Sequence, residues 1–236
     1  YFSILDEIAL GPRTLRDLSN ALGTPSTSLT EYLRTLQEMR IIDRELPVTS
    51  DERSTGYRYR LTDGFFRFWF RFVRPFASEL EAGLKPADLW AAEVEPAFPA
   101  HIAPAFEVLC RRWVRTSLGS EASRVGGWWG PALNELRAKG ERQTEEIDVV
   151  GLHRGRFSIV GECKWTAKPV SVSLLGDIER YKLPALEQTG VKVRKDGPLI
   201  VLFSRCGFTD GLKSAARESE RLRLVELEEL VPRPAG

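Results

Sequence analysis

The sequence predicts an α/β protein in two parts, a small helical part followed by a larger part built on a mixed sheet. Two observations lead to this prediction. Short amphipathic patterns and two strand-like runs fill the first 62 residues, and helical and strand-like segments alternate over residues 97–236. The chain has 236 residues, 42% of them hydrophobic and 28% charged, which is ordinary for a folded protein with a sizeable core.

Composition excludes several classes of protein. No apolar run approaches the roughly 20 residues that a membrane-spanning helix needs, and no signal-peptide pattern opens the chain. We therefore expect a cytoplasmic protein with no membrane partner. The cysteines Cys110, Cys163 and Cys206 lie far apart without a CxxC pair, so neither a disulfide framework nor a structural zinc site is predicted. The chain opens inside a helical pattern at Tyr1, and we expect a further segment before it.

Charge is distributed unevenly along a chain whose net charge is only +1. Residues 1–62 hold eight Lys/Arg against nine Asp/Glu, residues 63–96 hold four against six, and residues 97–236 hold twenty-two against eighteen. The basic excess thus belongs to the last part, which favours an anionic polymer such as DNA as its partner.

The first 62 residues have the element order of a winged helix-turn-helix domain. The expected helices cover residues 1–10, 14–23 and a stretch that begins at residue 24, and the expected strands cover 41–46 and 57–61. Thr14 and Asp17 have the spacing of a capping box, which marks the start of the second helix. Leu29, Leu33 and Leu36 recur at helical intervals and predict the inner face of the third helix.

Four arginines of this domain are candidate contacts for DNA phosphates. They are Arg34 in the third helix and Arg53, Arg58 and Arg60 in the ribbon. The alternative is a solvated surface on a domain that docks another protein, because the domain is slightly acidic and a DNA reader is usually more basic. We expect residues 1–62 to bind duplex DNA weakly and residues 97–236 to supply most of the affinity.

Residues 63–96 form an aromatic helix and a linker. Six aromatic residues stand in the nine positions from Phe65 to Val73, with one polar stripe formed by Arg67, Arg71 and Arg74. We expect most of this helix to be buried, as a connection between the two domains rather than as a surface on which bases stack.

Residues 97–236 predict an α/β sandwich with a mixed sheet. The expected order is a helix over 104–118, strands over 125–130, 144–151 and 157–165, a helix over 172–188, a strand over 198–204, a helix over 209–221 and a strand over 222–227. The run from Pro198 to Ser204 is almost entirely apolar, as expected of a buried central strand. Residues 134–142 are expected to be a solvated connector.

The two arms of the central hairpin carry charged residues at positions that suggest a metal site. Side chains alternate along a strand, so Glu146 and Asp148 are expected on one face, and Glu162 and Lys164 are expected on one face of the next arm. Two carboxylates and a lysine at the same end of a sheet would bind Mg²⁺ or Mn²⁺ through hard oxygen ligands. The alternative is an exposed ion-pair cluster worth about 0–1 kcal/mol.

This arrangement resembles the restriction-endonuclease-like, PD-(D/E)xK, nuclease superfamily, through Asp148 and Glu162-Cys163-Lys164. The resemblance implies a restriction-endonuclease-like α/β sandwich in which Asp148, Glu162 and the Cys163 carbonyl hold Mg²⁺ or Mn²⁺. It also implies that Lys164 orients or deprotonates the attacking water. Glu107, on the preceding helix, matches a further acidic position of the superfamily. From the helix alone, a surface pair of Glu107 with Arg111 is favoured over an orientation toward the carboxylates on the sheet.

Taken whole, the chain resembles the C-terminal half of archaeal-type ATPases that carry the DUF234 domain. The resemblance implies a preceding ATPase domain as a partner, but no GxxxxGK[S/T] motif is present and no nucleotide site is expected here. Tyr181 and Lys182, on the helix after the hairpin, are candidate phosphate contacts or plain surface residues. The function expected is a metal-dependent DNA phosphodiesterase module, with a catalytically silent DNA-binding or protein-interaction module as the alternative.

Overall fold

The computed structural model describes residues 1–51, 54 and 56–231. Two compact units divide the chain: the first comprises Tyr1–Leu46 and Ser50–His101, and the second comprises Pro47–Thr49 and Ile102–Gly236. Residues 63–96, which we expected to connect two domains, thus belong to the first unit. The predicted α/β class with a mixed sheet is confirmed. Within the described residues, no helix is long and apolar enough to cross a membrane.

The first unit begins with three helices and a two-stranded antiparallel ribbon. They are α1 (Phe2–Ala9), α2 (Leu15–Leu22), α3 (Ser26–Glu38), β1 (Ile42–Glu45) and β2 (Arg58–Leu61). The predicted capping box is present, because the Thr14 hydroxyl accepts from the Asp17 amide and the Asp17 carboxylate accepts from the Thr14 amide. Gly23 then ends α2 in the left-handed conformation, with φ of 58°. The three predicted leucines of α3 are all buried in the core of this unit.

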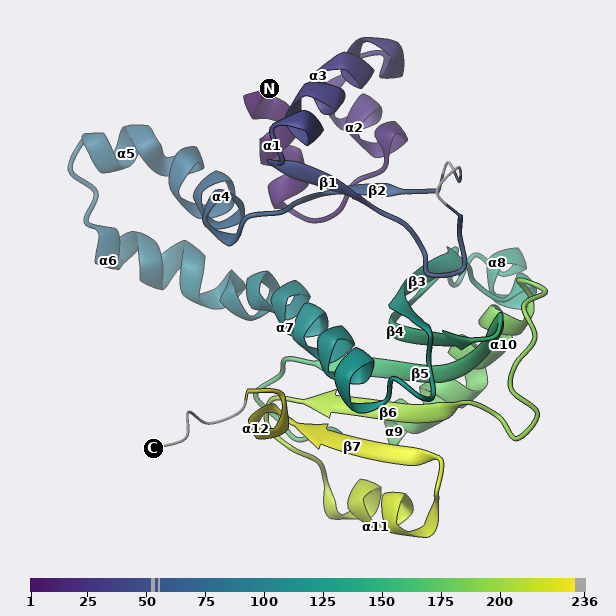
Figure 1. Ribbon diagram of the computed structural model, residues 1–236. Helices are drawn as coiled ribbons and strands as arrows, with labels where there is room; N and C mark the ends of the chain where they lie inside the picture. Colours follow the sequence, from purple (N-terminus) through teal and green to yellow (C-terminus); the bar gives the residue numbers. More distant parts are fainter. Residues whose placement is uncertain (52–53, 55, 232–236) are drawn as a thin grey trace. The chain divides into compact units, whose positions relative to one another are not determined.

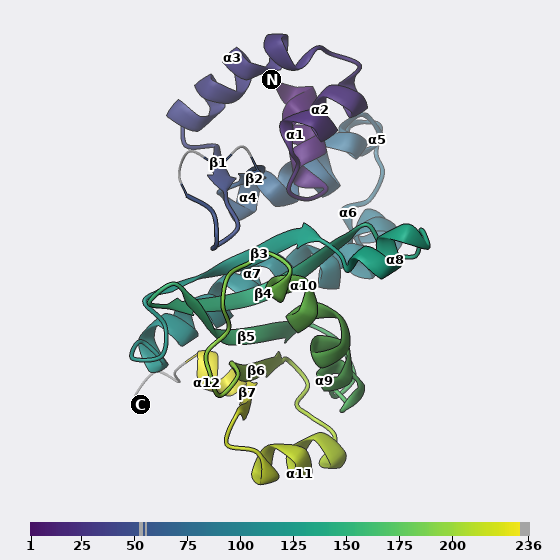
Figure 2. The ribbon, with the colours of Figure 1, turned by 90° about the vertical axis from the view of Figure 1, so that its right-hand side faces the viewer.

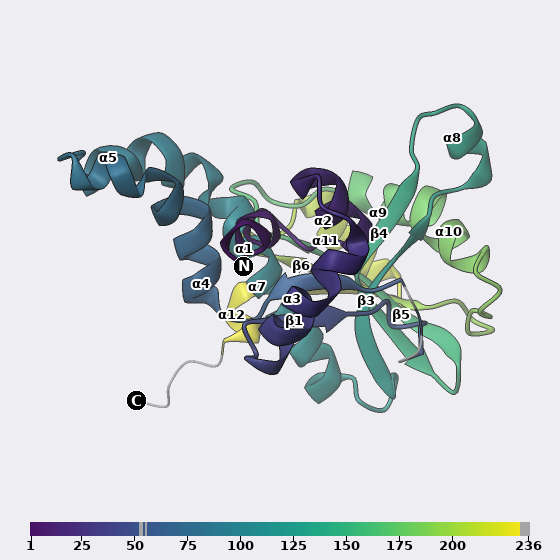
Figure 3. The ribbon, with the colours of Figure 1, turned by 90° about the horizontal axis from the view of Figure 1, so that it is seen from above.

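The aromatic segment continues the first unit as a series of short helical turns. It consists of α4 (Gly64–Phe68), a π-helical turn (Trp69–Val73), a 3₁₀ turn (Arg74–Phe76), α5 (Ala77–Glu81), α6 (Pro86–Leu89) and a second π-helical turn (Trp90–Val94). Figure 3 shows α4 beside α1 within this unit. Phe70 and Phe72 are buried, and Arg74 pairs with Asp6 of α1 at 2.6 Å. Phe65 is 65% exposed and Trp69 is 40% exposed. The expectation that most of this helix is buried is therefore wrong for its first turns.

The second unit is built on a five-stranded mixed sheet with the order β3-β4-β5-β6-β7 (Figure 1). Its strands are β3 (Arg124–Pro131), β4 (Thr144–His153), β5 (Arg156–Lys164), β6 (Leu199–Ser204) and β7 (Leu222–Glu226). The first three strands are antiparallel, while β5, β6 and β7 are parallel. The helices are α7 (Glu95–Ser117, which begins in the first unit), α8 (Asn134–Ala138), α9 (Ser173–Asp177), a π-helical turn (Ile178–Lys182), α10 (Leu183–Glu187), α11 (Asp210–Glu218) and α12 (Leu227–Leu230). The predicted connector at 134–142 therefore contains a short helix.

Helices cover both faces of this sheet (Figure 2). On one face, Phe106 and Cys110 of α7 pack against Val149, Ile159 and Phe203. On the other face, α9, α10 and α11 cover a second core that includes the fully buried residues Ile147, Val160, Ile178, Leu202 and Leu212. The apolar run of β6 is thus explained, because its side chains meet a core on each side.

A bulge in β4 changes the expected alternation of its side chains. Gly126 pairs with Val150 and Trp128 pairs with Ile147, so one residue of β3 stands opposite two residues of β4, one of which is Asp148. Ile147 and Val150 consequently share one core although three positions separate them. The strict alternation expected along this arm therefore does not hold between Ile147 and Val150. Asp148 therefore has no register partner in β3 or β5.

Candidate functional site

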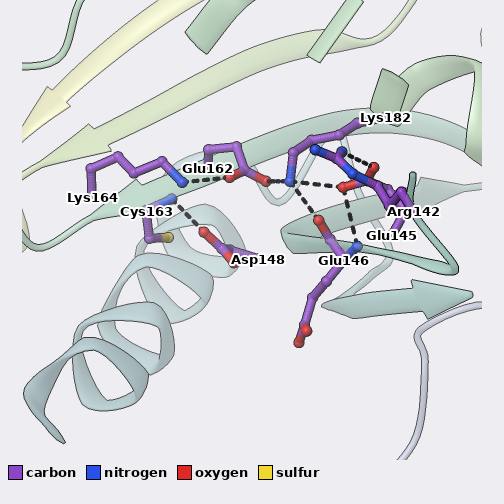
Figure 4. A network of polar contacts seen from close by, with 8 residues as sticks. All are labelled: Arg142, Glu145, Glu146, Asp148, Glu162, Cys163, Lys164 and Lys182. Carbon is purple, nitrogen blue, oxygen red and sulfur yellow. Dashed lines mark hydrogen bonds and ion pairs between the residues drawn. The ribbon is translucent and has the colours of Figure 1, made fainter. Parts of the chain in front are cut away.

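Asp148 lies where strands β4 and β5 separate. The paired register of the two strands ends at Val149 and Gly161, one residue short of Asp148 and Glu162. The Asp148 carboxylate takes the place of a backbone partner, because its Oδ2 accepts from the Cys163 amide at 2.8 Å (Figure 4). The side chain is therefore held between the two strands rather than in open solvent.

Glu162 lies beside Asp148 on β5 and is held by two lysines. Its side chain is almost fully buried, with 1% of the residue exposed. Lys164 Nζ lies 2.8 Å from Oε2, and Lys182 Nζ lies 2.7 Å from Oε1 (Figure 4). Buried charges need partners of this kind, because an isolated carboxylate would lose several kcal/mol of solvation.

Lys182 connects the carboxylates of the two strands. It projects from the π-helical turn between α9 and α10, and its ammonium donates to the Glu146 carbonyl at 2.5 Å and lies 3.5 Å from the buried Glu145 carboxylate. Arg142 pairs with Glu145 at 2.6 Å. Sequence reasoning placed Lys182 among candidate phosphate contacts and missed Glu145. Lys182 stands four residues after the buried Ile178, so both side chains share the face of the helix that is turned toward the sheet. This spacing could have predicted that Lys182 contacts the sheet.

Tyr181, the residue before Lys182, has its ring in contact with two arginine side chains. The guanidinium carbons of Arg142 and Arg180 lie 5.2 and 5.3 Å from the centre of the ring. Such contacts stabilise the position of the ring by cation–π attraction.

Glu107 on α7 both pairs with Arg111 and faces the carboxylates of the sheet, which were the two alternatives expected for it. Its carboxylate pairs with Arg111 at 2.8 Å, as an i, i+4 pair, and it also lines the pocket that contains Asp148. Arg111 Nε donates to the Asp148 carbonyl at 2.7 Å. The pair therefore ties α7 to the bulge of β4.

These side chains surround one pocket of about 600 Å³. Its lining comprises Glu107, Arg142, Thr144, Glu145, Glu146, Asp148, Glu162, Lys164, Leu174, Asp177 and Lys182. Six carboxylates stand against three cationic side chains, so the lining has an excess of three negative charges at neutral pH. The sequence-predicted group of Glu107, Asp148, Glu162 and Lys164 is thus brought together by the fold.

The surroundings of Asp148 disfavour its ionised form. Burial and the neighbouring Glu162 charge raise its pKa from 3.8 to about 6, although the Cys163 amide and the two lysines oppose this rise. Burial alone would lower the pKa of Lys164, but the attraction of Glu162 and Asp148 outweighs it and raises that pKa. Burial and contact with Cys110 raise the pKa of Cys163 well above its usual range, so its thiol stays protonated.

The donor set fits a hard divalent cation in its chemistry. Within the described residues, no group of three or more His, Cys, Asp and Glu side chains is arranged to hold a metal ion. Asp148 and Glu162 nevertheless place two carboxylates, which are suitable oxygen ligands, in a pocket with surplus negative charge. Burial and then the Glu162 charge raise the pKa of Asp148, and a bound cation would offset both effects. Protein backbone and water supply the remaining ligands in many magnesium sites.

Three of the candidate DNA contacts of the first unit, Arg34, Arg58 and Arg60, have acidic neighbours. Arg34 lies 3.7 Å from Glu31 and 3.9 Å from Glu38 on the surface of α3. Arg60 and Arg58 are the register partners of Asp43 and Glu45 across the ribbon. Arg53 lies outside the described residues.

Fold and pocket together define an α/β protein whose mixed sheet carries a carboxylate–lysine pocket at the separation of two strands. Comparison with known proteins adds a family: residues 69–174 match DUF234, described as archaea bacterial proteins of unknown function. The predicted resemblance to DUF234 is confirmed over this segment, which contains Glu107, Asp148, Glu162 and Lys164.

A curated relative extends the similarity beyond that segment. An uncharacterized protein of Methanocaldococcus jannaschii is 28% identical over 171 residues, which is 70% of this chain. The chain spans 35% of that relative's length.

Proposed function

We propose that the second unit is a metal-dependent phosphodiesterase module that acts on DNA. The observation that carries the proposal is the convergence of Asp148, Glu162 and Lys164 from adjacent strands on one acidic pocket. This combination suits metal-dependent cleavage of phosphodiesters, since carboxylates hold a cation and a lysine stabilises charge on the phosphate.

In this proposal Asp148, Glu162 and the Cys163 carbonyl hold Mg²⁺ or Mn²⁺. The bound cation would lower the pKa of its water and neutralise charge on the phosphate. Asp148 is oriented for this task by the Cys163 amide, and Glu107 is held at the pocket by Arg111. Glu107 would bind water or a second cation.

Lys164 would act on the reacting groups directly. Its ammonium is kept protonated and in place by Glu162, and it lies at the pocket wall, 34% exposed. A cation in this position stabilises the negative charge that builds on the non-bridging oxygens. Lys182 holds the other oxygen of Glu162 and thereby fixes the carboxylate toward the pocket.

The proposed partners are DNA and an ATPase domain. The basic excess of residues 97–236 supports DNA as the substrate, and the resemblance to archaeal-type ATPases supports the ATPase. In the same proposal the three helices and ribbon of the first unit are a winged helix with a minor share of the DNA affinity, because their arginines are offset by acidic neighbours.

A cleavage assay with two pocket variants tests the proposal. With Mn²⁺ and DNA, Lys164→Ala should reduce cleavage by at least about 100-fold, as loss of a charge-stabilising group does. Asp148→Ala should abolish cleavage by removing a ligand. Lys168→Ala, which changes an exposed lysine four residues further along the chain, is the matched control and should cleave at the wild-type rate. Cleavage by the Asp148→Ala variant at the wild-type rate would contradict the proposal.

A specific observation favours a second function, that of a catalytically silent DNA-binding module. Both oxygens of Glu162 are already paired with lysines, so the cluster is able to serve as a buried ion-pair network that holds β5 against the helix after it. In that case the wild-type protein would bind DNA in a salt-dependent manner without cleaving it, and Lys164→Ala would change stability alone.

A further inference from the structure

A second cavity of the same unit lies at the turn between β4 and β5. It has a volume of about 400 Å³ and is lined by Glu121, His153, Arg154, Arg156 and Arg194, together with two serines. We call it the basic pocket. It shares no lining residue with the acidic pocket, and His153 stands five residues along β4 from Asp148, about 17 Å at ~3.4 Å per residue.

Positive charge in the basic pocket exceeds the charge that the protein itself supplies to balance it. Three arginines face a single carboxylate, Glu121, which pairs with Arg194 at 2.5 Å. Neither Arg154 nor Arg156 makes an ion pair with any residue that the structure describes. Unneutralised guanidinium groups gathered at one cavity repel one another, and an anion between them would remove that repulsion.

The backbone of the turn is strained at one of these arginines. Arg154 has φ of 50° and Gly155 has φ of 73°, in a two-residue turn closed by the pair His153 and Arg156. Turns of this type favour Asn or Gly at the first position, because other side chains crowd the backbone there. An arginine in such a conformation is a candidate for a functional role of its side chain.

The neighbouring loop presents its arginine in a fixed position. Phe157, which is fully buried, donates from its amide to the Lys192 carbonyl at 3.0 Å and accepts from the Arg194 amide at 2.9 Å. These two hydrogen bonds attach the loop to β5 beside the turn. His153 Nδ1 is buried without a hydrogen-bond partner among the described residues, which is uncommon for a buried polar atom.

We propose that the basic pocket binds a phosphoryl group. Guanidinium groups match phosphate oxygens in geometry and charge, and the volume leaves room for a group attached to the phosphate. The phosphoryl group would belong to a small phosphorylated molecule or to a terminal or backbone phosphate of DNA. The proposal does not require the acidic pocket to bind metal or to cleave DNA, because the two pockets have no residue in common.

Calorimetric titration of the full chain with inorganic pyrophosphate tests this proposal. The wild-type protein should bind, and Arg156→Gln should weaken binding about tenfold or more, because a charge-assisted contact to phosphate is lost. Arg154→Asn should weaken binding similarly while keeping or raising the melting temperature, since Asn tolerates the left-handed conformation. That variant separates loss of binding from loss of folding.

Two further variants control the titration. Glu121→Gln should tighten binding, because it removes the carboxylate that competes for Arg194. Arg217→Gln, an exposed arginine on α11 outside both pockets, should bind pyrophosphate as the wild type does. Absence of binding by the wild type, or equal binding by the Arg154, Arg156 and Arg217 variants, would overturn the proposal.

Competition with a short DNA oligonucleotide then identifies the source of the phosphoryl group. If pyrophosphate displaces the oligonucleotide and Arg156→Gln weakens both, the pocket binds a DNA phosphate. If the oligonucleotide binds equally well with and without pyrophosphate, the pocket binds a small phosphorylated molecule.

Discussion

The ionised carboxylate of Asp148 is energetically unfavourable in the acidic pocket, because it is buried and close to Glu162. Asp148 is one of the two residues of β4 in the bulge, it replaces a backbone partner for Cys163, and it stands beside the Glu162 charge. Groups placed in this way reduce the stability of the folded state and are concentrated at functional sites. Asp148 is therefore the residue whose replacement separates a functional site from a purely structural one.

The shifted pKa of Asp148 predicts how its replacement changes stability with pH. The folded-state pKa of about 6 lies above the ordinary value of 3.8, so the folded protein binds a proton more readily than the unfolded chain. The resulting contribution to stability is fully present below about pH 3.8 and is lost as the pH rises through about 6. Asp148→Asn should therefore raise the free energy of unfolding at pH 8 by about 1–3 kcal/mol, with a smaller difference at pH 4.5.

Urea unfolding at the two pH values measures this difference. Asp177→Asn, an exposed position on the same pocket, is the control and should change the midpoint little at either pH. An Asp148→Asn variant that is less stable than the wild type at pH 8 would show that the carboxylate stabilises the fold instead.

At the scale of elements, the separation of β4 from β5 creates the site. At Gly161, β5 approaches both neighbouring strands closely. A Cβ atom added at Gly161 would lie 2.7 Å from the Val201 carbonyl oxygen of β6 and 3.2 Å from Val149 Cβ of β4. Only glycine allows that approach. Gly161 thus holds β5 in register one residue before Glu162.

Gly161→Ala should destabilise the second unit by about 1–3 kcal/mol through forced displacement of a strand. Thermal unfolding monitored by circular dichroism provides the measurement. Gly176→Ala is the matched control, because no atom lies within 4 Å of its added Cβ and alanine favours a helix; it should keep or raise the melting temperature. A melting temperature unchanged by Gly161→Ala would contradict this role of the close contact.

Elements with strong local signals could be predicted from the sequence. The capping box of α2, the apolar run of β6 and the two arms of the hairpin all match the structure. The bulge at Asp148 could not be predicted, because it depends on pairing with β3 around Gly127, where a Cβ would lie 3.1 Å from Arg111 Nη2. Register set by such distant contacts leaves no local pattern.

At the scale of the whole molecule, the sequence predicted which strands carry the site but not how its charges pair. Asp148, Glu162 and Lys164 were expected together, since neighbouring strands bring their ends together. The attachment of Lys182 to Glu162 joins residues 20 positions apart through a π-helical turn, and no periodic pattern contains that information. Phe65 and Trp69 of the first unit were expected to be buried, but they are exposed. An aromatic-rich segment predicts burial, but its composition does not show whether another element covers each aromatic side chain.

In the proposed function, Asp148 and Glu162 bind a divalent cation. Electron paramagnetic resonance of Mn²⁺ measures this directly, because the signal of free Mn²⁺ falls when the ion is bound by protein. At pH 8, above the pKa of Asp148, the wild-type chain should bind one Mn²⁺, Lys164→Ala should bind it as well, and Asp148→Asn should lose it. A wild-type protein in excess that leaves the free Mn²⁺ signal unchanged, or an Asp148→Asn variant that binds like the wild type, would contradict the claim.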